Sequence, residues 1–147
     1  MHVAGRNGSA GRKVASDLSV SFGGVTSPAT CSALKRADLL VNATPVGGLA
    51  AADDSPLPDG VPLPSRGVVF DLVYRPRMTR LLRRARDEDC ETVEGLRLLV
   101  EQAALSFEIW TGREGPREVM RAAALKALDE RGPEPGRGLP AMHREGI

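Results

Sequence analysis

Polar side chains that could contact a ligand follow three apolar runs of this sequence. Gly5-Arg6-Asn7 comes after the first run, Asn42-Ala43-Thr44-Pro45 after another, and Asp71 to Tyr74 close a further one. Ligands of open parallel sheets bind outside the carboxyl ends of the strands. If the runs are parallel strands, we expect these residues to lie along one ligand-binding edge.

Arg6 is the cation among these candidates. A guanidinium can pair bidentately with a phosphate and stack on a base. In dinucleotide-binding folds, an Arg near this place accommodates a 2′-phosphate, whereas an acidic residue selects the 2′-hydroxyl. The alternative is an ordinary exposed arginine in a turn, which position alone favours.

The polar residues after the other two runs also have two interpretations. Asn42 and Thr44 could hydrogen-bond a ribose or a substrate hydroxyl, or they could bond their own backbone in a turn before Pro45. Tyr74 is either a ligand contact or a tyrosine that packs at the rim of the sheet. Asp71 lies inside an apolar strand, so we expect its carboxylate to accept hydrogen bonds from backbone or Arg.

Gln102 lies in a second apolar stripe of a long predicted helix, between Leu98 and Leu105. We expect a buried amide there, which needs a neighbouring backbone or a polyhydroxy ligand as its partner. No metal site is predicted, because Cys31 and Cys90 form no C-x-x-C pair and the two histidines lie near opposite ends. The usual phosphate-loop, G-x-G-x-x-G and nucleophile motifs are also missing from the sequence.

The elements that must position these residues alternate between strands and helices. Strands are predicted at 2–4, 18–22, 38–42, 67–74 and 90–93, and helices at about 10–17, 31–36, 78–85, 96–111 and 116–128. Residues 43–66 read as a long irregular loop. This alternation predicts an α/β protein with parallel strands.

The composition limits the classes of function. The chain has 147 residues, 20 basic and 19 acidic side chains, and 41% apolar residues. That fits one domain with a core. Near-neutral charge argues against nucleic-acid binding, and the apolar runs are too short to span a membrane. No secretory signal begins the chain, so a cytoplasmic location is expected.

Four segments in order closely resemble the cofactor-binding half of shikimate dehydrogenase. They are residues 38–47 (Asp-Leu-Leu-Val-Asn-Ala-Thr-Pro-Val-Gly), 69–76 (Val-Phe-Asp-Leu-Val-Tyr-Arg-Pro), the stretch from 95 to 104 through Gly95-Leu96, Leu98-Leu99-Val100 and Gln102-Ala103-Ala104, and 107–112 (Phe-Glu-Ile-Trp-Thr-Gly). The resemblance covers about residues 2–128. It implies an NADP-dependent oxidoreductase that interconverts 3-dehydroshikimate and shikimate in aromatic amino-acid biosynthesis.

The resemblance also implies roles for single residues. Gly5-Arg6-Asn7 corresponds to the family's Asn-Arg-Thr, so Arg6 and Asn7 would bind the adenosine end of NADP, with Arg6 on the 2′-phosphate. The residues that would bind the rest of the cofactor are Asn42, Ala43, Thr44, Val73 and Gly95, the last through its carbonyl. Tyr74 and Gln102 would face the substrate.

Parts of the family pattern are missing from this sequence. The N-terminal substrate domain with its Lys/Asp catalytic pair, the first strand and the glycine-rich loop have no counterpart, so no catalytic residue is expected here. We therefore expect an incomplete doubly wound, Rossmann-like sheet that lacks its central strand, with two exposed inner strand edges. Residues 1–130 are expected to form this partial NADP-binding domain and 131–147 a disordered tail.

Three hypotheses follow from the sequence. The first is the C-terminal part of a shikimate dehydrogenase whose gene is truncated, split or given too late a start, inactive alone and in need of a missing substrate domain. The second is a non-catalytic nucleotide-binding or interaction remnant. The third is an NAD-dependent quinate/shikimate dehydrogenase, against which Arg6 argues.

Overall fold

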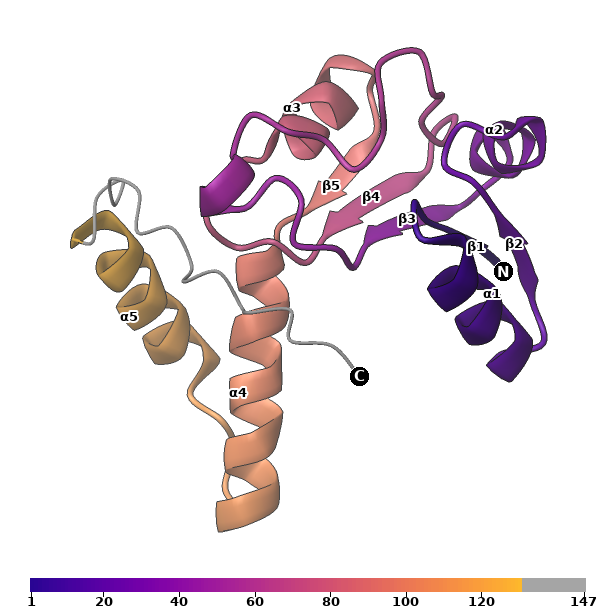
Figure 1. Ribbon diagram of the computed structural model, residues 1–147. Helices are drawn as coiled ribbons and strands as arrows, with labels where there is room; N and C mark the ends of the chain where they lie inside the picture. The colour runs from indigo at the N-terminus through magenta and orange to yellow at the C-terminus, as the bar shows by residue number, and fades with distance from the viewer. Residues whose placement is uncertain (131–147) are drawn as a thin grey trace, which may run out of the picture.

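Strands and helices alternate along the chain, as predicted, in the computed structural model, which describes residues 1–130 (Figure 1). The predicted tail at 131–147 lies outside the described residues. The elements are β1 (His2–Ala4), α1 (Gly8–Asp17), β2 (Ser21–Gly23), α2 (Pro28–Lys35), β3 (Leu39–Asn42), the short 3-10 helix η1 (Leu49–Ala51), β4 (Val68–Asp71), α3 (Arg80–Asp87), β5 (Glu91–Val93), α4 (Gly95–Thr111) and α5 (Arg117–Glu130).

The strands form two separate parallel sheets. β1 pairs with β2, and β3, β4 and β5 form the second sheet in that order. The break lies between β1 and β3, where a doubly wound order places its central strand. The expectation of an incomplete α/β sheet with two open inner edges is therefore confirmed.

The main core lies on one face of the second sheet. Val69 of β4 packs there with Leu81, Leu82 and Ala85 of α3, all at most 1% exposed. Leu34 of α2 belongs to the same cluster, so α2 joins the first sheet to the core of the second. α3 begins at Thr79, whose hydroxyl accepts a hydrogen bond from the Leu82 N–H and caps the helix.

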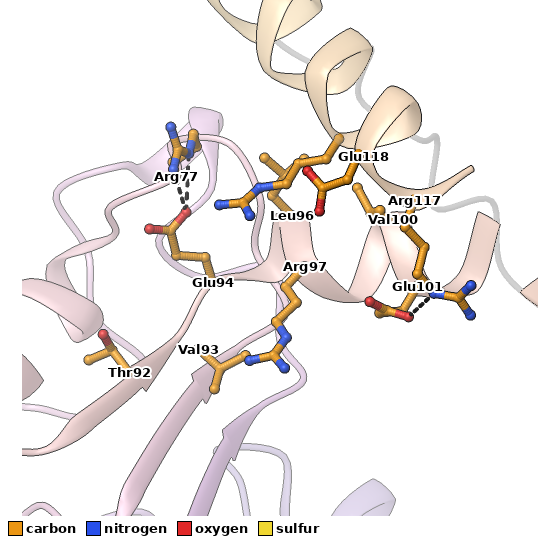
Figure 2. Close-up of a pocket in the computed structure, with 11 residues that line it drawn as sticks. Arg77, Thr92, Val93, Glu94, Leu96, Arg97, Val100, Glu101, Arg117 and Glu118 are labelled. Atoms are coloured by element: carbon orange, nitrogen blue, oxygen red, sulfur yellow. Dashed lines mark hydrogen bonds and ion pairs between the residues drawn. The ribbon is translucent and has the colours of Figure 1, made fainter. Parts of the chain in front are cut away.

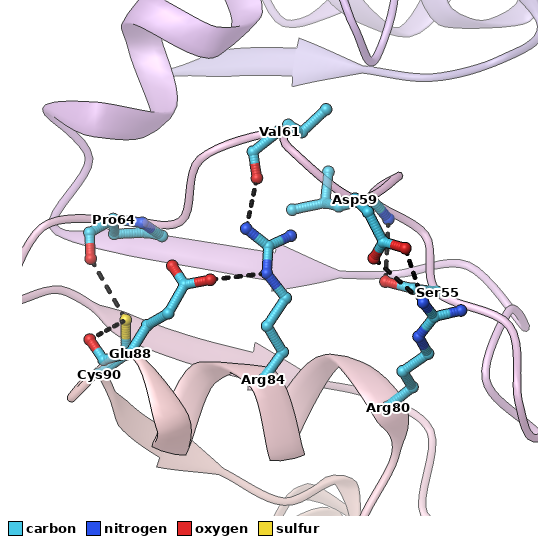
Figure 3. A network of polar contacts seen from close by, with 9 residues as sticks. Ser55, Asp59, Val61, Pro64, Arg80, Arg84, Glu88 and Cys90 are labelled. Carbon is cyan, nitrogen blue, oxygen red and sulfur yellow. Dashed lines mark hydrogen bonds and ion pairs between the residues drawn. The ribbon is translucent and has the colours of Figure 1, made fainter.

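The segment predicted as an irregular loop contributes to this core. Leu57, Val61 and Leu63 are each no more than 6% exposed. Arginines of α3 hold the segment in place: Arg84 donates to the Val61 carbonyl at 2.6 Å, and Arg80 pairs with both Asp59 oxygens (Figure 3). Periodicity could not reveal this burial, because the segment is mostly without regular structure.

The first two helices begin earlier than predicted. α1 begins at Gly8 with Asn7 as its N-cap, because the Asn7 side chain accepts from the N–H groups of Ser9 and Ala10. α2 is capped by Ser27 and has Pro28 in its first turn. In both helices a capping side chain sets the first residue, and the pattern of apolar residues gives no indication of such caps.

The two C-terminal helices are less buried than predicted. α4 and α5 pack on each other, but only Gly95, Leu96, Val100 and Ala104 of α4, and no residue of α5, are buried. Trp110 is 82% exposed and Val119 67%, although the apolar periodicity of residues 96–111 and 116–128 predicts that each helix buries one side, with Trp110 and Val119 on it. The prediction was wrong because nothing else in the described part of the chain covers these helices (Figure 1).

None of the helices in the described residues is long and apolar enough to cross a membrane.

Candidate functional site

A buried polar network links the ends of β3 and β4. The Asp71 side chain is fully buried and accepts hydrogen bonds from the Asn42 amide at 2.9 Å, the Thr79 hydroxyl at 2.7 Å and the Val73 N–H at 3.0 Å. Asn42 and Asp71 are the last paired residues of their strands. The network therefore fixes the point at which both chains leave the sheet, and the role of Thr79 in it was not foreseen.

The turn after β3 is held by its own side chains. The Asn42 carbonyl oxygen accepts from the Thr44 N–H and the Thr44 hydroxyl, at 3.0 and 2.7 Å, and its amide also donates to the Val46 carbonyl. The local interpretation of Asn42 and Thr44 is thus correct for these bonds. They shape the backbone beside the strand ends.

A groove of about 570 Å³ opens between these two strand ends. Its lining residues come from the segments after β3 and after β4: Ala43, Thr44, Pro45, Gly48, Leu49, Leu72, Val73, Tyr74 and Arg75. Four of the predicted ligand contacts, Ala43, Thr44, Val73 and Tyr74, therefore share one groove. Its volume falls in the range of small-molecule sites, roughly 300–1,000 Å³.

Gly95 lies against the wall of this groove, at the first residue of α4. A Cβ atom there would come within 2.5 Å of the Leu72 carbonyl oxygen and 2.6 Å of that of Val73. Both of those residues line the groove. Only glycine permits this approach of α4 to the end of β4.

Arg6 and Asn7 lie apart from the groove, at the carboxyl end of β1 in the other sheet. Arg6 is exposed, and the Asn7 side chain is engaged in capping α1. Since a helix N-terminus carries partial positive charge, it adds to the Arg6 guanidinium there. This end of the molecule suits an anion, whereas the groove carries mostly uncharged groups.

The two predicted substrate contacts lie in different surroundings. Tyr74 lines the groove and is 46% exposed, whereas Gln102 is exposed on α4 and lines neither cavity. The expectation of a buried Gln102 amide was wrong. The stripe of α4 that contains Gln102 also holds Leu105 and Ile109, which are 51% and 81% exposed.

A second cavity, of about 440 Å³, lies where β5, α4 and α5 meet (Figure 2). Its charged residues largely pair with one another: Arg77 donates two hydrogen bonds to Glu94, and Arg117 pairs with Glu101 at 3.0 Å (Figure 2). Arg117 also contacts Glu108 at 2.7 Å. Such pairs hold α5 against α4.

The contacts of Arg117 shift the ionisation of the groups at this joint. The Arg117 hydrogen bond, aided by the Gly115 N–H, lowers the pKa of Glu108 below its ordinary value. The same carboxylate and that of Glu101 raise the pKa of Arg117. Both groups therefore stay ionised across the neutral range.

Burial raises the pKa of the Cys90 thiol, with Glu88 adding to the effect. Its Sγ donates to the Pro64 carbonyl, so it behaves as a packed thiol (Figure 3). Within residues 1–130, no group of three His, Cys, Asp or Glu side chains is arranged to hold a metal ion.

Comparison with known proteins places this geometry in a family. The model of the shikimate 5′-dehydrogenase C-terminal domain matches residues 95–125. Shikimate dehydrogenase (NADP⁺) of Symbiobacterium thermophilum is 51% identical over 98 residues, and that of Methanopyrus kandleri is 48% identical over 95. The chain is homologous to the C-terminal part of the shikimate dehydrogenases. The matched region takes up 67% and 65% of this chain but 33% of each relative, so the chain spans about a third of their length.

Solved structures agree with this assignment. Shikimate 5-dehydrogenase from Thermus thermophilus, in complex with NADP(H) and shikimate, superposes with a TM-score of 0.75 at 35% identity and covers 86% of this chain and 46% of its own. Quinate dehydrogenase from Corynebacterium glutamicum, in complex with NAD, gives a TM-score of 0.69 at 30% identity, over 85% of this chain and 45% of its own. The fold described above thus superposes on part of each of these two enzymes.

Proposed function

We propose that this chain is the cofactor-binding part of an NADP-dependent shikimate dehydrogenase, which interconverts 3-dehydroshikimate and shikimate, and that it has no dehydrogenase activity alone. The observation that carries the proposal is the groove shared by Ala43, Thr44, Val73 and Tyr74 at the carboxyl ends of β3 and β4. Relatives of this chain are NADP-dependent shikimate dehydrogenases, which supports the choice of cofactor and substrate.

The residues of the groove fit the nicotinamide end of a dinucleotide. Ala43, Thr44 and Gly48 leave room beside the backbone, and Gly95 brings the start of α4 to the groove wall where a Cβ would collide. In the proposal, Val73 packs against the ring and the Gly95 carbonyl accepts from the carboxamide. Asn42 acts indirectly, because its bonds to Asp71 and Thr44 fix the loop that lines the groove. The bound cofactor would supply the hydride acceptor or donor.

Arg6 is proposed to bind the 2′-phosphate of NADP. It is an exposed cation at the carboxyl end of β1, directly before the capped N-terminus of α1. Guanidinium and helix N-terminus both favour a phosphate. Asn7 would contribute by holding the first turn of α1 in place, since its side-chain oxygen already accepts two N–H groups.

Tyr74 and Gln102 are proposed to face shikimate, with the remaining walls supplied by a substrate-binding domain. The exposed apolar side chains of α4 support such a partner: Leu105 is 51% exposed, Ile109 81% and Trp110 82%. Large exposed apolar groups on one helix are typical of a docking surface. That domain would carry the catalytic pair, because hydride transfer needs both reactants held in contact.

A chimera tests the proposal. We would join the N-terminal part of the Symbiobacterium thermophilum relative to residues 2–147 and follow NADPH formation with shikimate. We expect turnover by the chimera and none by the isolated chain. A folded chimera without turnover, or turnover by the isolated chain, would contradict the proposal.

The role of Arg6 is tested in the same chimera by Arg6→Ala. Loss of a bidentate phosphate contact should raise KM for NADP about 10- to 100-fold, from the ~1.5–3 kcal/mol of a charged hydrogen bond, with little change for NAD. Arg12→Ala, at an exposed arginine within α1, is the matched control. A preference for NAD and quinate in the unsubstituted chimera would instead favour the quinate dehydrogenase alternative, for which the Corynebacterium glutamicum structure is a precedent.

A further inference from the structure

The cavity where β5, α4 and α5 meet lies on the far side of α4 from the groove (Figure 2). Gly95 approaches the groove wall, whereas α4 lines the cavity with Leu96, Arg97, Val100 and Glu101. At about 3.6 residues per turn, these four positions centre on the side of the helix opposite Gly95. The cavity and the groove share no lining residue, so binding in the cavity does not depend on the proposed reaction.

Some of the charged side chains in the cavity neutralise one another. Four arginines and three glutamates line it. Glu94 accepts two hydrogen bonds from Arg77, and Glu101 accepts one from Arg117. Two arginines and one glutamate of the lining remain, so the cavity has an excess of one positive charge.

The remaining charged residues are Arg97, Arg121 and Glu118. Their side chains make no hydrogen bond or ion pair with another residue of the described range 1–130. All three are exposed, so water solvates them. A ligand that displaces this water must replace it with charge-assisted hydrogen bonds of its own.

The register of the two helices brings the two unpaired arginines together. α4 and α5 run in opposite directions, and Arg117 at the start of α5 pairs with Glu101 (Figure 1). Arg121 follows Arg117 by about one helical turn. Arg97 precedes Glu101 by the same interval, so the antiparallel arrangement places Arg97 opposite Arg121. Two guanidiniums that face each other repel, whereas an anion between them attracts both.

We propose that Arg97 and Arg121 bind a small organic acid by its carboxylate. A guanidinium presents its donors in a plane that matches a carboxylate. The apolar part of the ligand packs on Val93, Leu96 and Val100, which line the same cavity. The cavity volume of about 440 Å³ falls within the roughly 300–1,000 Å³ that is typical of small-molecule sites.

Glu118 limits the charge of this ligand. Its carboxylate lines the same cavity, so it repels a second negative charge on the ligand. Together with the two unpaired arginines it leaves a charge of +1, which one carboxylate neutralises. The apolar wall favours an acid with an aromatic or branched aliphatic body over an inorganic anion. The bound acid links α5 to α4 one turn from the Arg117–Glu101 pair.

A titration of the 147-residue chain with benzoate tests the proposal. Residue-resolved NMR should show saturable shifts at Val93, Leu96 and Val100, and none at Thr44 and Tyr74 in the groove. Benzamide keeps the ring but lacks the charge, and acetate keeps the charge but lacks the ring. We expect both to bind at least 10-fold more weakly than benzoate, and inorganic phosphate likewise.

Substitutions at the two arginines supply the matched variants. Arg97→Gln and Arg121→Gln should each weaken benzoate binding about 10-fold, because each removes one charged hydrogen-bond donor group. Arg113→Gln, at an exposed arginine between α4 and α5 that lies outside the cavity lining, should leave it unchanged. Arg97→Glu puts a carboxylate opposite Arg121, so it should abolish binding without lowering Tm.

Four outcomes would overturn the proposal. The first is equal binding of benzoate and benzamide, which would show that the ring alone is recognised. The second is phosphate binding as tight as that of benzoate, which would show that the apolar wall takes no part. The third is unchanged affinity in both glutamine variants of Arg97 and Arg121. The fourth is a benzoate response at Thr44 and Tyr74 without one at Val93, which would place the acid in the groove.

Discussion

The two sheets differ in how their strands are buried. In β1, α1 and β2, Ala15 is the single buried residue, whereas β4 holds Val69 and Asp71 at 0% exposure. β4 is also the one strand, among those described, with a neighbour on each side. Short parallel strands thus contribute buried side chains to a core when they are paired on both edges and covered by a helix such as α3.

The largest effect is expected from a pair of substitutions that shorten one side chain in each sheet. Leu82→Ala removes a fully buried side chain beneath β4 and should lower the free energy of unfolding by about 3 kcal/mol. Val3→Ala in half-buried β1 should cost under about 1 kcal/mol, because its site is already partly hydrated. Urea unfolding followed by circular dichroism measures both. Equal losses would mean that the first sheet carries as much of the stability as the second.

The second test removes the polar network that ends β3 and β4. Asp71→Ala leaves the Asn42 amide, the Thr79 hydroxyl and the Val73 N–H without their acceptor, and should cost about 2–3 kcal/mol. Asp71→Asn keeps the shape and one oxygen, so about 1 kcal/mol is expected. A loss as large for Asn as for Ala would show that charge, and not hydrogen bonding, dominates at this site.

Hydrogen exchange compares the sheets directly in the unsubstituted chain. We expect amides that pair β1 and the following Gly5 with β2, such as those of Val3 and Gly5, to exchange about 10- to 100-fold faster than Phe70 in β4. Local opening costs less where few apolar contacts must be broken. Exchange at one common rate would instead show that both sheets open together.

Pairing also explains which strand boundaries the sequence could predict. The apolar run at 67–74 predicts a long strand, but β4 ends at Asp71, opposite the last residue of β3, Asn42. Beyond that pair, Leu72 and Val73 leave the sheet and line the groove. Their apolar character indicates burial near a strand, but the length of the partner strand sets where the sheet ends.

Those parts of the candidate site that follow from the order of the strands could be predicted from the sequence. The rule that ligands bind at the carboxyl ends of parallel strands brings Thr44 and Tyr74 to one groove, as the structure has them. The Asn42–Asp71–Thr79 network needs contacts eight and 29 positions apart, which no local pattern encodes. The predicted burial of Gln102 was wrong for a different reason. The helical period shows which side chains of α4 share a face, but it does not show which face packs against the rest of the protein.

The smallest expected effect concerns the α4–α5 joint, which lies outside both sheets. The folded-state pKa of Glu108 is lowered by its hydrogen bond from Arg117, so this contact stabilises α5 above the ordinary carboxyl value of 4.5. The stabilisation is lost as pH falls from there through the lowered pKa. Both side chains are about a third exposed, at 34% for Arg117 and 30% for Glu108, so solvent screens the pair and the effect is small.

Glu108→Gln checks this sign. The difference in Tm between the parent chain and the variant should be present at pH 6 and shrink as the pH falls below about 4.5, because the parent then loses the charge that the variant lacks. Glu118→Gln is the control, because it removes a carboxylate from the first turn of α5 that is not one of the two paired with Arg117. Because α5 packs mainly on α4, exchange in β4 should stay unchanged in both variants. A Tm difference that grows toward acidic pH would contradict the assignment of Glu108 as an ionised partner of Arg117.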